Sequence, residues 1–221
     1  MTLKCAAISD THNAHKDIWL PPDLDVLIHA GDFCSWGVES EAENFLEWFK
    51  KQDAAYKIFI AGNHDKCLEK YDAKDILSSI ANVPNIFYLQ DSEVIIEGHK
   101  FYGSPWTPEF GVGWAFNAKR GREIREIWDK IPEGCEVLIT HGPPRGILDL
   151  IPPSYVRSYE NPHVGCDDLL EAVTKIKPKY HIFGHIHCGY GSYLGNNTTF
   201  YNAATCDEQY RASNSCHVFT L

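Results

Sequence analysis

Short apolar runs alternate along the chain with segments in which apolar residues recur every three or four positions. The runs, several of them rich in Val, Ile, Phe and Tyr, predict β-strands at 3–9, 26–30, 57–61, 86–89, 94–96, 137–140, 180–183, 199–202 and 217–221. The segments of helical period lie at 40–52, 73–80, 119–130 and 167–176, and a proline follows soon after each of the last two. Strands and helices therefore alternate in both halves of the chain, which predicts an α/β protein with a largely parallel sheet.

Local signals refine some of these elements. In the segment 40–52, apolar residues such as Phe45 and Phe49 recur among charged ones, and Ser40 with Glu43 fits a capping box at the helix start. The dipeptide Glu97-Gly98 lies between two strand-like runs and predicts a hairpin. Segments 103–113 and 142–153 are rich in Gly and Pro, so we expect surface loops, which often carry functional residues on a rigid scaffold.

Length, charge and cysteine usage narrow the class of protein. With 221 residues, 44% of them hydrophobic, the chain can bury a full core, and we expect one domain over 1–221. The N-terminal apolar run is too short for a membrane span and lacks the layout of a signal peptide, so we expect a cytoplasmic protein that does not use a membrane as a partner. The net charge of −10 argues against a protein that coats duplex nucleic acid. The eight cysteines contain no CxxC pair, which favours reduced thiols over a zinc ribbon.

Polar residues gather where five of the predicted strands stop. The clusters are Ser9-Asp10-Thr11-His12, His29-Ala30-Gly31-Asp32, Ala61-Gly62-Asn63-His64-Asp65, Thr140-His141-Gly142 and Phe183-Gly184-His185-Ile186-His187. Ligands bind at the carboxyl ends of strands in open α/β sheets, so these clusters should converge in space. Any one of these motifs is common in proteins, but the five in this order are not. Their carboxylates, amide and imidazoles suit a pair of divalent metal ions.

The series D-x-H, GD, GNHD, HG and GHxH, which runs from Asp10 to His187, resembles the calcineurin-like metallophosphoesterase superfamily. The resemblance implies an α/β fold with a two-sheet β-sandwich flanked by helices and two divalent metal ions, with Mn preferred over Fe, Zn, Co or Mg. It also implies the metal ligands, which are Asp10, His12 and His187 for one ion, Asn63, His141 and His185 for the other, and Asp32 for both.

The same resemblance implies a mechanism. A hydroxide that bridges the ions would attack phosphorus in line, and His64 would protonate or stabilise the leaving oxygen, unless it only supports a ligand by a hydrogen bond. Apart from the resemblance, Asp65 is adjacent to His64 in the sequence, and on that ground we expect it to orient the imidazole. No Arg follows Asp32 as it does in the serine/threonine phosphatases, and Ser35 stands where purple acid phosphatases have a metal-binding Tyr. We therefore set those two branches aside.

Three stretches resemble a narrower group, the metallophosphoesterase-domain proteins related to a brain-expressed cyclic-nucleotide phosphodiesterase. They are GSPWTPEFGVGWAFNAKRG from Gly103, HGPPRGILD from His141 and GHIHCGYG from Gly184. The likeness implies hydrolysis of small phosphodiesters such as 2′,3′-cyclic AMP. Trp106, Phe110, Trp114 and Phe116 are candidates to stack a base, with core packing as the alternative. Asn117, Arg120, Arg122 and Arg145 are candidates to contact phosphate or ribose, with an exposed salt bridge as the alternative for each Arg.

Other functions stay open at this stage. A catalytically weak module that keeps the metals and holds a nucleotide or a protein partner is the alternative to an enzyme, and a monoesterase is an alternative within the enzyme class. We expect a small phosphodiester or nucleotide as the substrate and no long nucleic acid, since the chain is short and acidic. Cys34, Cys67 and Cys188 lie near ligand motifs, and each is either a buried reduced residue or a site sensitive to oxidation or zinc.

Overall fold

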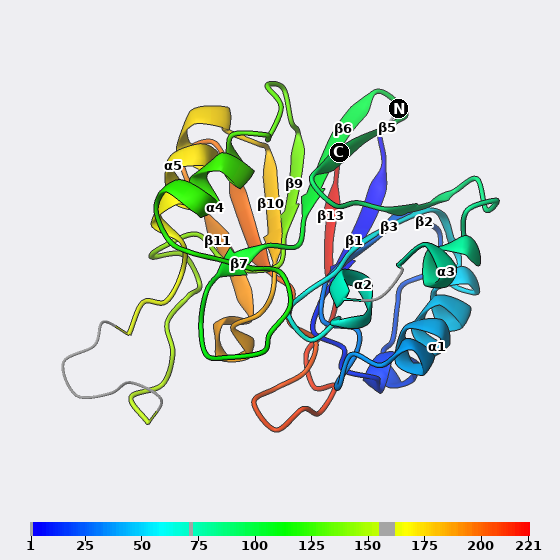
Figure 1. Cartoon of the computed structure of the whole chain (residues 1–221). Coiled ribbons are helices and arrows are strands. Elements are labelled where there is room, and N and C mark those ends of the chain that lie inside the picture. The colour runs from blue at the N-terminus through cyan, green and yellow to red at the C-terminus, as the bar shows by residue number, and fades with distance from the viewer. Residues whose placement is uncertain (1, 71–72, 155–161) are drawn as a thin grey trace.

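The computed structural model describes residues 2–70, 73–154 and 162–221, and in this part of the chain two β-sheets pack face to face between two layers of helices (Figure 1). The strand orders are β13-β1-β2-β3-β4 in the first sheet and β11-β12-β10-β9-β6-β5 in the second. A short pair, β7 (Thr107–Pro108) with β8 (Asn117–Ala118), lies outside both sheets. The predicted α/β fold, a two-sheet sandwich flanked by helices, is confirmed.

The first sheet is parallel except at one edge. Its parallel strands are β1 (Lys4–Ile8), β2 (Leu24–Ala30), β3 (Ala54–Ile60) and β4 (Ile86–Tyr88). Strand β13 (His217–Thr220) joins β1 in the antiparallel direction. The helices on its outer face are α1 (Glu39–Lys50), α2 (Cys67–Lys70) and α3 (Ala73–Ser78), and a 3₁₀ turn, η1 (Ala14–Asp17), follows β1.

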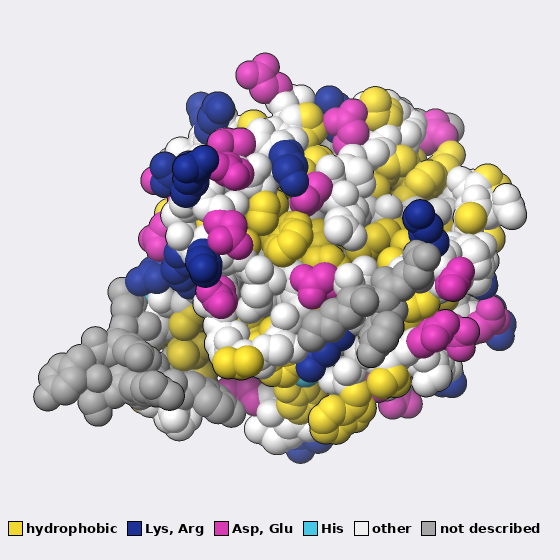
Figure 2. Space-filling view, viewed as in Figure 1, with side chains coloured by type: hydrophobic (Ala, Val, Ile, Leu, Met, Phe, Trp, Pro, Cys, Tyr) yellow, Lys and Arg dark blue, Asp and Glu magenta, His cyan; other side chains and the backbone are white. Residues whose placement is uncertain are grey.

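The second sheet has a parallel centre and antiparallel edges. The parallel strands are β6 (His99–Ser104), β9 (Val137–Thr140), β10 (Tyr180–Phe183) and β12 (Thr199–Asn202). The antiparallel edge strands are β5 (Ser92–Ile96) and β11 (Gly191–Leu194). The outer helices are α4 (Arg122–Trp128) and α5 (Asp167–Ile176), and η2 (His187–Gly189) follows β10. Figure 2 shows Lys and Arg side chains near these two helices, with acidic side chains among them.

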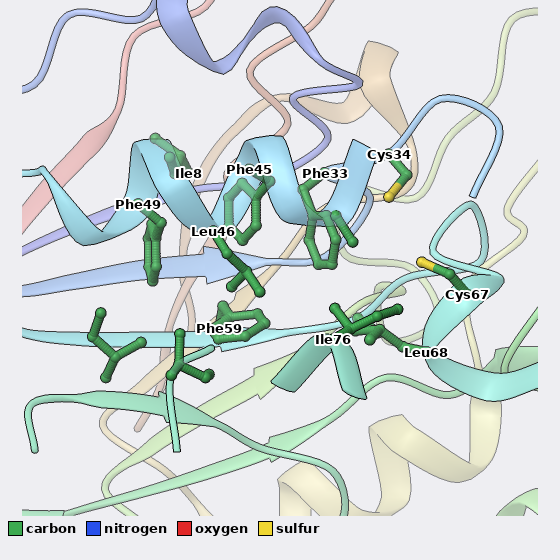
Figure 3. Packing of buried hydrophobic residues seen from close by; sticks show 14 of the residues in the cluster. Ile8, Phe33, Cys34, Phe45, Leu46, Phe49, Phe59, Cys67, Leu68 and Ile76 are labelled. Carbon is green, nitrogen blue, oxygen red and sulfur yellow. The ribbon is translucent and has the colours of Figure 1, made fainter. Parts of the chain in front are cut away.

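Each strand buries side chains on both faces of its sheet, because successive side chains point to opposite faces. Apolar residues of alternating position fill the space between the sheets, including Ala7, Ile28, Ile58, Ile139 and Ile182. The intervening positions face the helices, where Phe33, Phe45, Phe49 and Phe59 form an aromatic cluster under α1 (Figure 3). The rings of Phe33 and Phe45 stack with centroids 4.2 Å apart.

The predicted strands and helices are all present, with ends that differ by a few residues. The hairpin at Glu97-Gly98 is confirmed, since both residues have positive φ (50° and 88°), as the favoured two-residue turn requires. Strand β11 was not predicted because most of its side chains are exposed, so it lacks an apolar pattern. Among the described residues, none of the helices combines the length and apolar character needed to cross a bilayer.

The predicted capping box at Ser40 and Glu43 is wrong. Helix α1 begins one residue earlier, at Glu39, and the carboxylate of Glu41 accepts the backbone N–H groups of Trp36, Gly37 and Val38 at 2.8–3.3 Å. The other oxygen of Glu41 accepts from Asn13 at 2.6 Å. The cap is thus local and one step out of the predicted register, with Glu41 bonded to the residues just before the helix, and Asn13 adds one bond from elsewhere in the chain. The N-cap residue, Val38, has no side-chain oxygen, so the Ser/Thr-x-x-Glu pattern misses this helix start.

We expect Phe45→Ala to lower the free energy of unfolding by about 3–5 kcal/mol, because it removes a fully buried ring and leaves a cavity between α1 and the first sheet. Urea unfolding followed by circular dichroism measures the change. Trp19→Ala is the control, since the Trp19 side chain is 71% exposed and its loss should change stability by less than about 0.5 kcal/mol. Equal losses in the two variants would contradict the assigned core.

Candidate metal centre

The five polar clusters of the sequence meet at one edge of the sandwich. They follow the carboxyl ends of β1, β2 and β3 in one sheet and of β9 and β10 in the other. Backbone hydrogen bonds tie neighbouring clusters together: Asp10 N–H donates to Gly31 O at 2.9 Å and Gly184 N–H donates to His141 O at 2.9 Å. The predicted convergence of these residues is confirmed.

One set of ligand atoms comes from Asp10, His12 and His187, which lie close enough to hold one metal ion. Nε2 of His187 is 3.3 Å from Oδ1 of Asp10 and 3.2 Å from Nε2 of His12. The backbone N–H of His185 donates to both carboxylate oxygens of Asp10, at 3.0 and 2.9 Å. This set matches the residues expected for the first ion.

A second set comes from Asp32, His141 and His185, again close enough to hold an ion. Nε2 of His141 lies 3.2 Å from Oδ2 of Asp32 and 3.0 Å from Oδ1 of Asn63. The same Oδ2 of Asp32 is 4.0 Å from Nε2 of His12, a member of the first set. Asp32 thus lies between the two sets, where a bridging carboxylate is expected.

The histidines are held with their lone pairs toward the centre. Nδ1 donates to a backbone carbonyl in each of four cases, at 2.7–3.0 Å: His12 to Cys34, His64 to Ser35, His141 to Ala30 and His187 to Asp207. A carbonyl can only accept, so the neutral rings carry their proton on Nδ1 and leave Nε2 as a lone pair. Such fixed tautomers are typical of metal-binding histidines.

Two such lone pairs face each other at 3.2 Å, on Nε2 of His12 and Nε2 of His187. The acceptor oxygens of Asn63 and Asp32 likewise face Nε2 of His141. Acceptors that face acceptors inside a protein are stable only if a cation or extra protons lie among them. The residues present therefore fit a pair of metal ions.

Protons take the place of the ions when no metal is bound. Burial disfavours a charged imidazole, yet the neighbouring carboxylates prevail: Asp32 raises the pKa of His141 to about 9, and Asp10 raises that of His187 to about 9. Burial also disfavours a charged carboxylate and so raises its pKa. Even so, His187 holds the pKa of the Asp10 carboxyl well below its usual range, and His141 does the same for Asp32. Burial lowers the pKa of His185 to about 3, so this ring is neutral and ready to ligate.

Glycines allow the ligand loops to approach each other closely. A Cβ on Gly62 would collide with Oδ1 of Asp32 and would lie 2.6 Å from the backbone N of that residue. A Cβ on Gly184 would collide with the side chains of Asp10 and Ser9. The ligands themselves adopt strained backbone, with φ of 51° at Asp10, 58° at Asp32 and 67° at His185. Strain of this kind persists only where the surroundings impose it, and it is concentrated at functional sites.

Two buried side chains support the centre in ways the sequence did not reveal. Nδ1 of His29 accepts the Gly31 N–H at 3.2 Å, so its Nε2–H donates to Thr11 Oγ1 at 3.0 Å and links the first two ligand loops. Asp65 accepts the N–H groups of Asp32, Cys34 and Gly62 at 2.7–2.8 Å. The suggestion that Asp65 orients His64 was wrong, because the carbonyl of Ser35 holds that imidazole.

His64 lies at the open side of the centre. Its backbone N–H donates to Oδ1 of Asp32 at 2.7 Å, and its ring lies 4.7 Å from the ring of His12. A ligand atom of His64 is within 4.8 Å of ligand atoms of His12 and Asp32, so it can reach a group bound between the ions. Tyr210, which no motif singled out, places its ring 4.8 Å from that of His12 from a loop after β12.

The aromatic candidates divide into two pairs. Phe116 is fully buried, and Trp106 packs against it with Nε1 donating to Asp91 at 3.2 Å, so these two rings belong to the core. Phe110 lies 4.9 Å from the ring of His185, and Trp114 lies 4.6 Å from that of His64. The second pair therefore reaches the site.

The polar candidates mostly hold loops together. Asn117 donates to Ala115 O at 2.8 Å and accepts the Phe110 N–H at 3.2 Å. Arg120 donates to the carbonyls of Gly165 and Val164. Arg122 forms a salt bridge with Glu126 at the surface. Arg145 is half-buried, and its backbone N–H donates to Cys166 O. Arg120 also lines a cavity beside His185.

Two of the three cysteines near the ligand motifs are buried. The thiols of Cys34 and Cys67 point toward each other beneath the ligand loops (Figure 3). The contact with Cys67 and burial both raise the pKa of Cys34, which keeps this thiol protonated. Cys188 is exposed, and its Sγ donates to Leu150 O at 3.2 Å. The two buried thiols fit the alternative of unreactive, reduced residues.

Comparison with known proteins agrees with this centre. Residues 3–189 match the family model described as calcineurin-like phosphoesterase. The chain belongs to this family. It is 42% identical to human metallophosphoesterase domain-containing protein 1 over 97% of this chain and 69% of the relative, and 39% identical to UPF0046 protein K07C11.7 of Caenorhabditis elegans over 93% and 71%. A crystal structure matches with a TM-score of 0.63 at 16% identity over 99% of both chains, which shows the shared fold.

Family membership supports a metal-dependent phosphoesterase. Members use a dinuclear metal site, and this chain presents three overlapping groups of candidate ligands at the expected place: the two sets above and a third made of His12, Asp32 and His64. When two divalent ions are bound in such a site, they supply Lewis acidity that activates water and neutralises charge on phosphate.

We expect Gly184→Ala to lower bound metal below two ions per chain and activity by at least about 10²-fold, because the added Cβ collides with Asp10. Metal content after dialysis, by plasma mass spectrometry, is the primary readout. Gly98→Ala serves as the control: it introduces strain at φ 88° in a turn with open space around it and should still bind two ions. Full metal content in Gly184→Ala would refute the assigned ligand.

Metal affinity should rise with pH, since each ion must displace a proton from a histidine. His141 and His187 bind those protons with a pKa of about 9 in the metal-free protein, compared with 6.5 for a free imidazole. Their charge stabilises the metal-free fold fully below pH 6.5, and this contribution is lost as the pH rises through about 9. We expect affinity for Mn²⁺ to increase about tenfold per pH unit for each ion between pH 6.5 and 8. Calorimetric titration tests this, and a constant affinity would contradict it.

Proposed function

We propose that this protein is a dinuclear metal-dependent phosphodiesterase that hydrolyses small diesters of the 2′,3′-cyclic AMP type, with Mn²⁺ as its preferred ion. The ligands proposed are Asp10, His12 and His187 for one ion, Asn63, His141 and His185 for the other, and Asp32 between them. The donors are oxygen and imidazole nitrogen with no thiolate, a combination that suits Mn²⁺ as well as Fe²⁺, Zn²⁺, Co²⁺ or Mg²⁺.

The observation that favours a diester is a pair of adjoining hollows beside the centre. One, of about 420 Å³, includes Phe110 and Arg120, and the other, of about 260 Å³, includes Glu208 and Tyr210. They share Ile151, His185 and Ile186, so both open beside the proposed ligand His185. A phosphodiester has two organic arms, and a phosphate held at the ions could direct one arm into each hollow.

The chain supplies the remaining chemistry through His64 and Asp32. The carbonyl of Ser35 fixes the His64 proton on Nδ1, at 2.7 Å, so neutral His64 presents Nε2 to the centre. A second proton, on Nε2, would make it a general acid for the leaving oxygen. The N–H of His64 also donates to Oδ1 of Asp32, so a hydrogen bond joins the loop after β3, which carries the acid, to the loop after β2, which carries the bridging carboxylate.

The alternative is a module that keeps the ions but turns over esters slowly or not at all. The hollows would then hold a nucleotide without cleaving it. The two possibilities differ in a single quantity, the turnover at full metal loading.

The experiment is steady-state hydrolysis by metal-stripped protein reconstituted with Mn²⁺. The substrates are 2′,3′-cyclic AMP, 3′,5′-cyclic AMP, bis-p-nitrophenyl phosphate and the monoester p-nitrophenyl phosphate. We expect diesters to be cleaved at least about tenfold faster than the monoester, and Asp32→Ala to abolish turnover. His64→Ala should lower kcat by about 10²–10⁴-fold, most for poor leaving groups, with metal content unchanged.

His99→Ala is the matched control for His64→Ala, because His99 pairs with Glu136 on the second sheet, outside the metal centre. It should retain full turnover. Faster cleavage of the monoester would replace the diesterase by a monoesterase, and no turnover at full metal loading would establish the binding module.

A further inference from the structure

We infer that the cavity of about 420 Å³ beside His185 is a specificity pocket that takes a planar aromatic group of the substrate. The inference rests on the proposed function, because it assumes that the ions hold a phosphate at the centre. Its location supports it: His185 belongs both to the second ligand set and to the lining of the cavity. A group linked to a metal-held phosphate can therefore enter the cavity directly.

The walls of the cavity are mainly apolar. The side chains that make them so are Pro108, Phe110, Pro143, Ile151, Val164 and Ile186. Apolar walls with few polar groups favour an apolar ligand, because a polar one would lose its hydrogen bonds to water without replacement. The other hollow, by contrast, contains the carboxylate side chain Glu208.

Phe110 is the wall residue best suited to stack on a ring. Its own ring is stacked on that of Trp114 at 5.9 Å, with 23° between the planes, and lies 4.9 Å from the ring of His185. The Phe110 backbone N–H donates to Oδ1 of Asn117, which belongs to the β7–β8 pair. The ring is thus held in place before any ligand binds, which lowers the entropic cost of stacking.

Arg120, the one cationic side chain among the cavity residues that the structure describes, is bonded to other parts of the protein. Its guanidinium donates to Gly165 O at 2.8 Å and Val164 O at 2.7 Å, and lies 3.8 Å from the carboxylate of Asp167. These bonds fasten the 164–165 loop against the end of β8 and so shape one wall. Arg120 is therefore a residue that holds the wall of the cavity, with two of its N–H groups bonded to carbonyls and Asp167 beside its charge.

The test compares phenylphosphonate with methylphosphonate, two anions that the centre cannot hydrolyse and that differ only in the ring. Calorimetry on the full chain loaded with Mn²⁺ gives both dissociation constants. We expect phenylphosphonate to bind at least about tenfold more tightly, as burial of a ring predicts. Phe110→Ala should reduce this preference to about twofold, and Val164→Phe, which fills the cavity, should abolish it.

Val112→Ala is the matched control, because Val112 lies two residues from Phe110 in the same loop with its side chain 99% exposed. It should retain the wild-type preference. Equal binding of the two phosphonates by the wild type, or a preference that survives in both Phe110→Ala and Val164→Phe, would overturn the pocket while leaving the metal centre intact. Failure of both phosphonates to bind would instead overturn the proposed function, and the pocket with it.

Discussion

Two buried carboxylates, Asp10 and Asp32, are the groups around which this molecule is arranged. Each is almost fully buried, and each faces imidazole nitrogens at 3.2–3.3 Å. A buried carboxylate is tolerated only when it is hydrogen-bonded and paired with positive charge. Metal ions, or protons on His141 and His187 in their absence, supply that charge. This need for hydrogen bonds and positive charge explains why four imidazoles and an amide surround the two carboxylates, which could not otherwise be buried.

The apolar core of the sandwich offsets the free-energy cost of burying so many polar groups in one place. Large apolar clusters on both faces of each sheet fix the strands, and the ligands occupy only the loops that leave their carboxyl ends. Backbone in these loops is strained at Asp10, Asp32 and His185, and glycines such as Gly62 and Gly184 admit the carboxylates. Buried supports, His29 and Asp65, then link one loop to the next by hydrogen bonds to backbone groups. These hydrogen bonds and close approaches fix the positions of the ligand loops.

The proposed ligands and the hollows beside them come mostly from different segments of the chain. The ligand side chains and His64 lie on loops of short sequence motifs, close to the strands that hold them. The hollows share His185 with the ligand set, but longer segments supply other parts of their lining, including the 103–121 stretch that carries Phe110 and the loop that carries Tyr210. Those parts can vary in sequence without changing a ligand side chain.

The sequence by itself determined the strands and helices, their alternation, and the five polar clusters at strand ends. Those features are local. The period of the apolar residues depends on whether that segment is a strand or a helix, and each polar motif lies within a single loop. Only the tertiary structure decided that Phe116 lies in the core while Phe110 faces the centre, although both belong to one aromatic loop.

It likewise decided that Arg120 holds backbone carbonyls and that Tyr210 reaches His12. A side chain's neighbours depend on how segments distant in the chain pack together, and no periodicity within one segment contains that information.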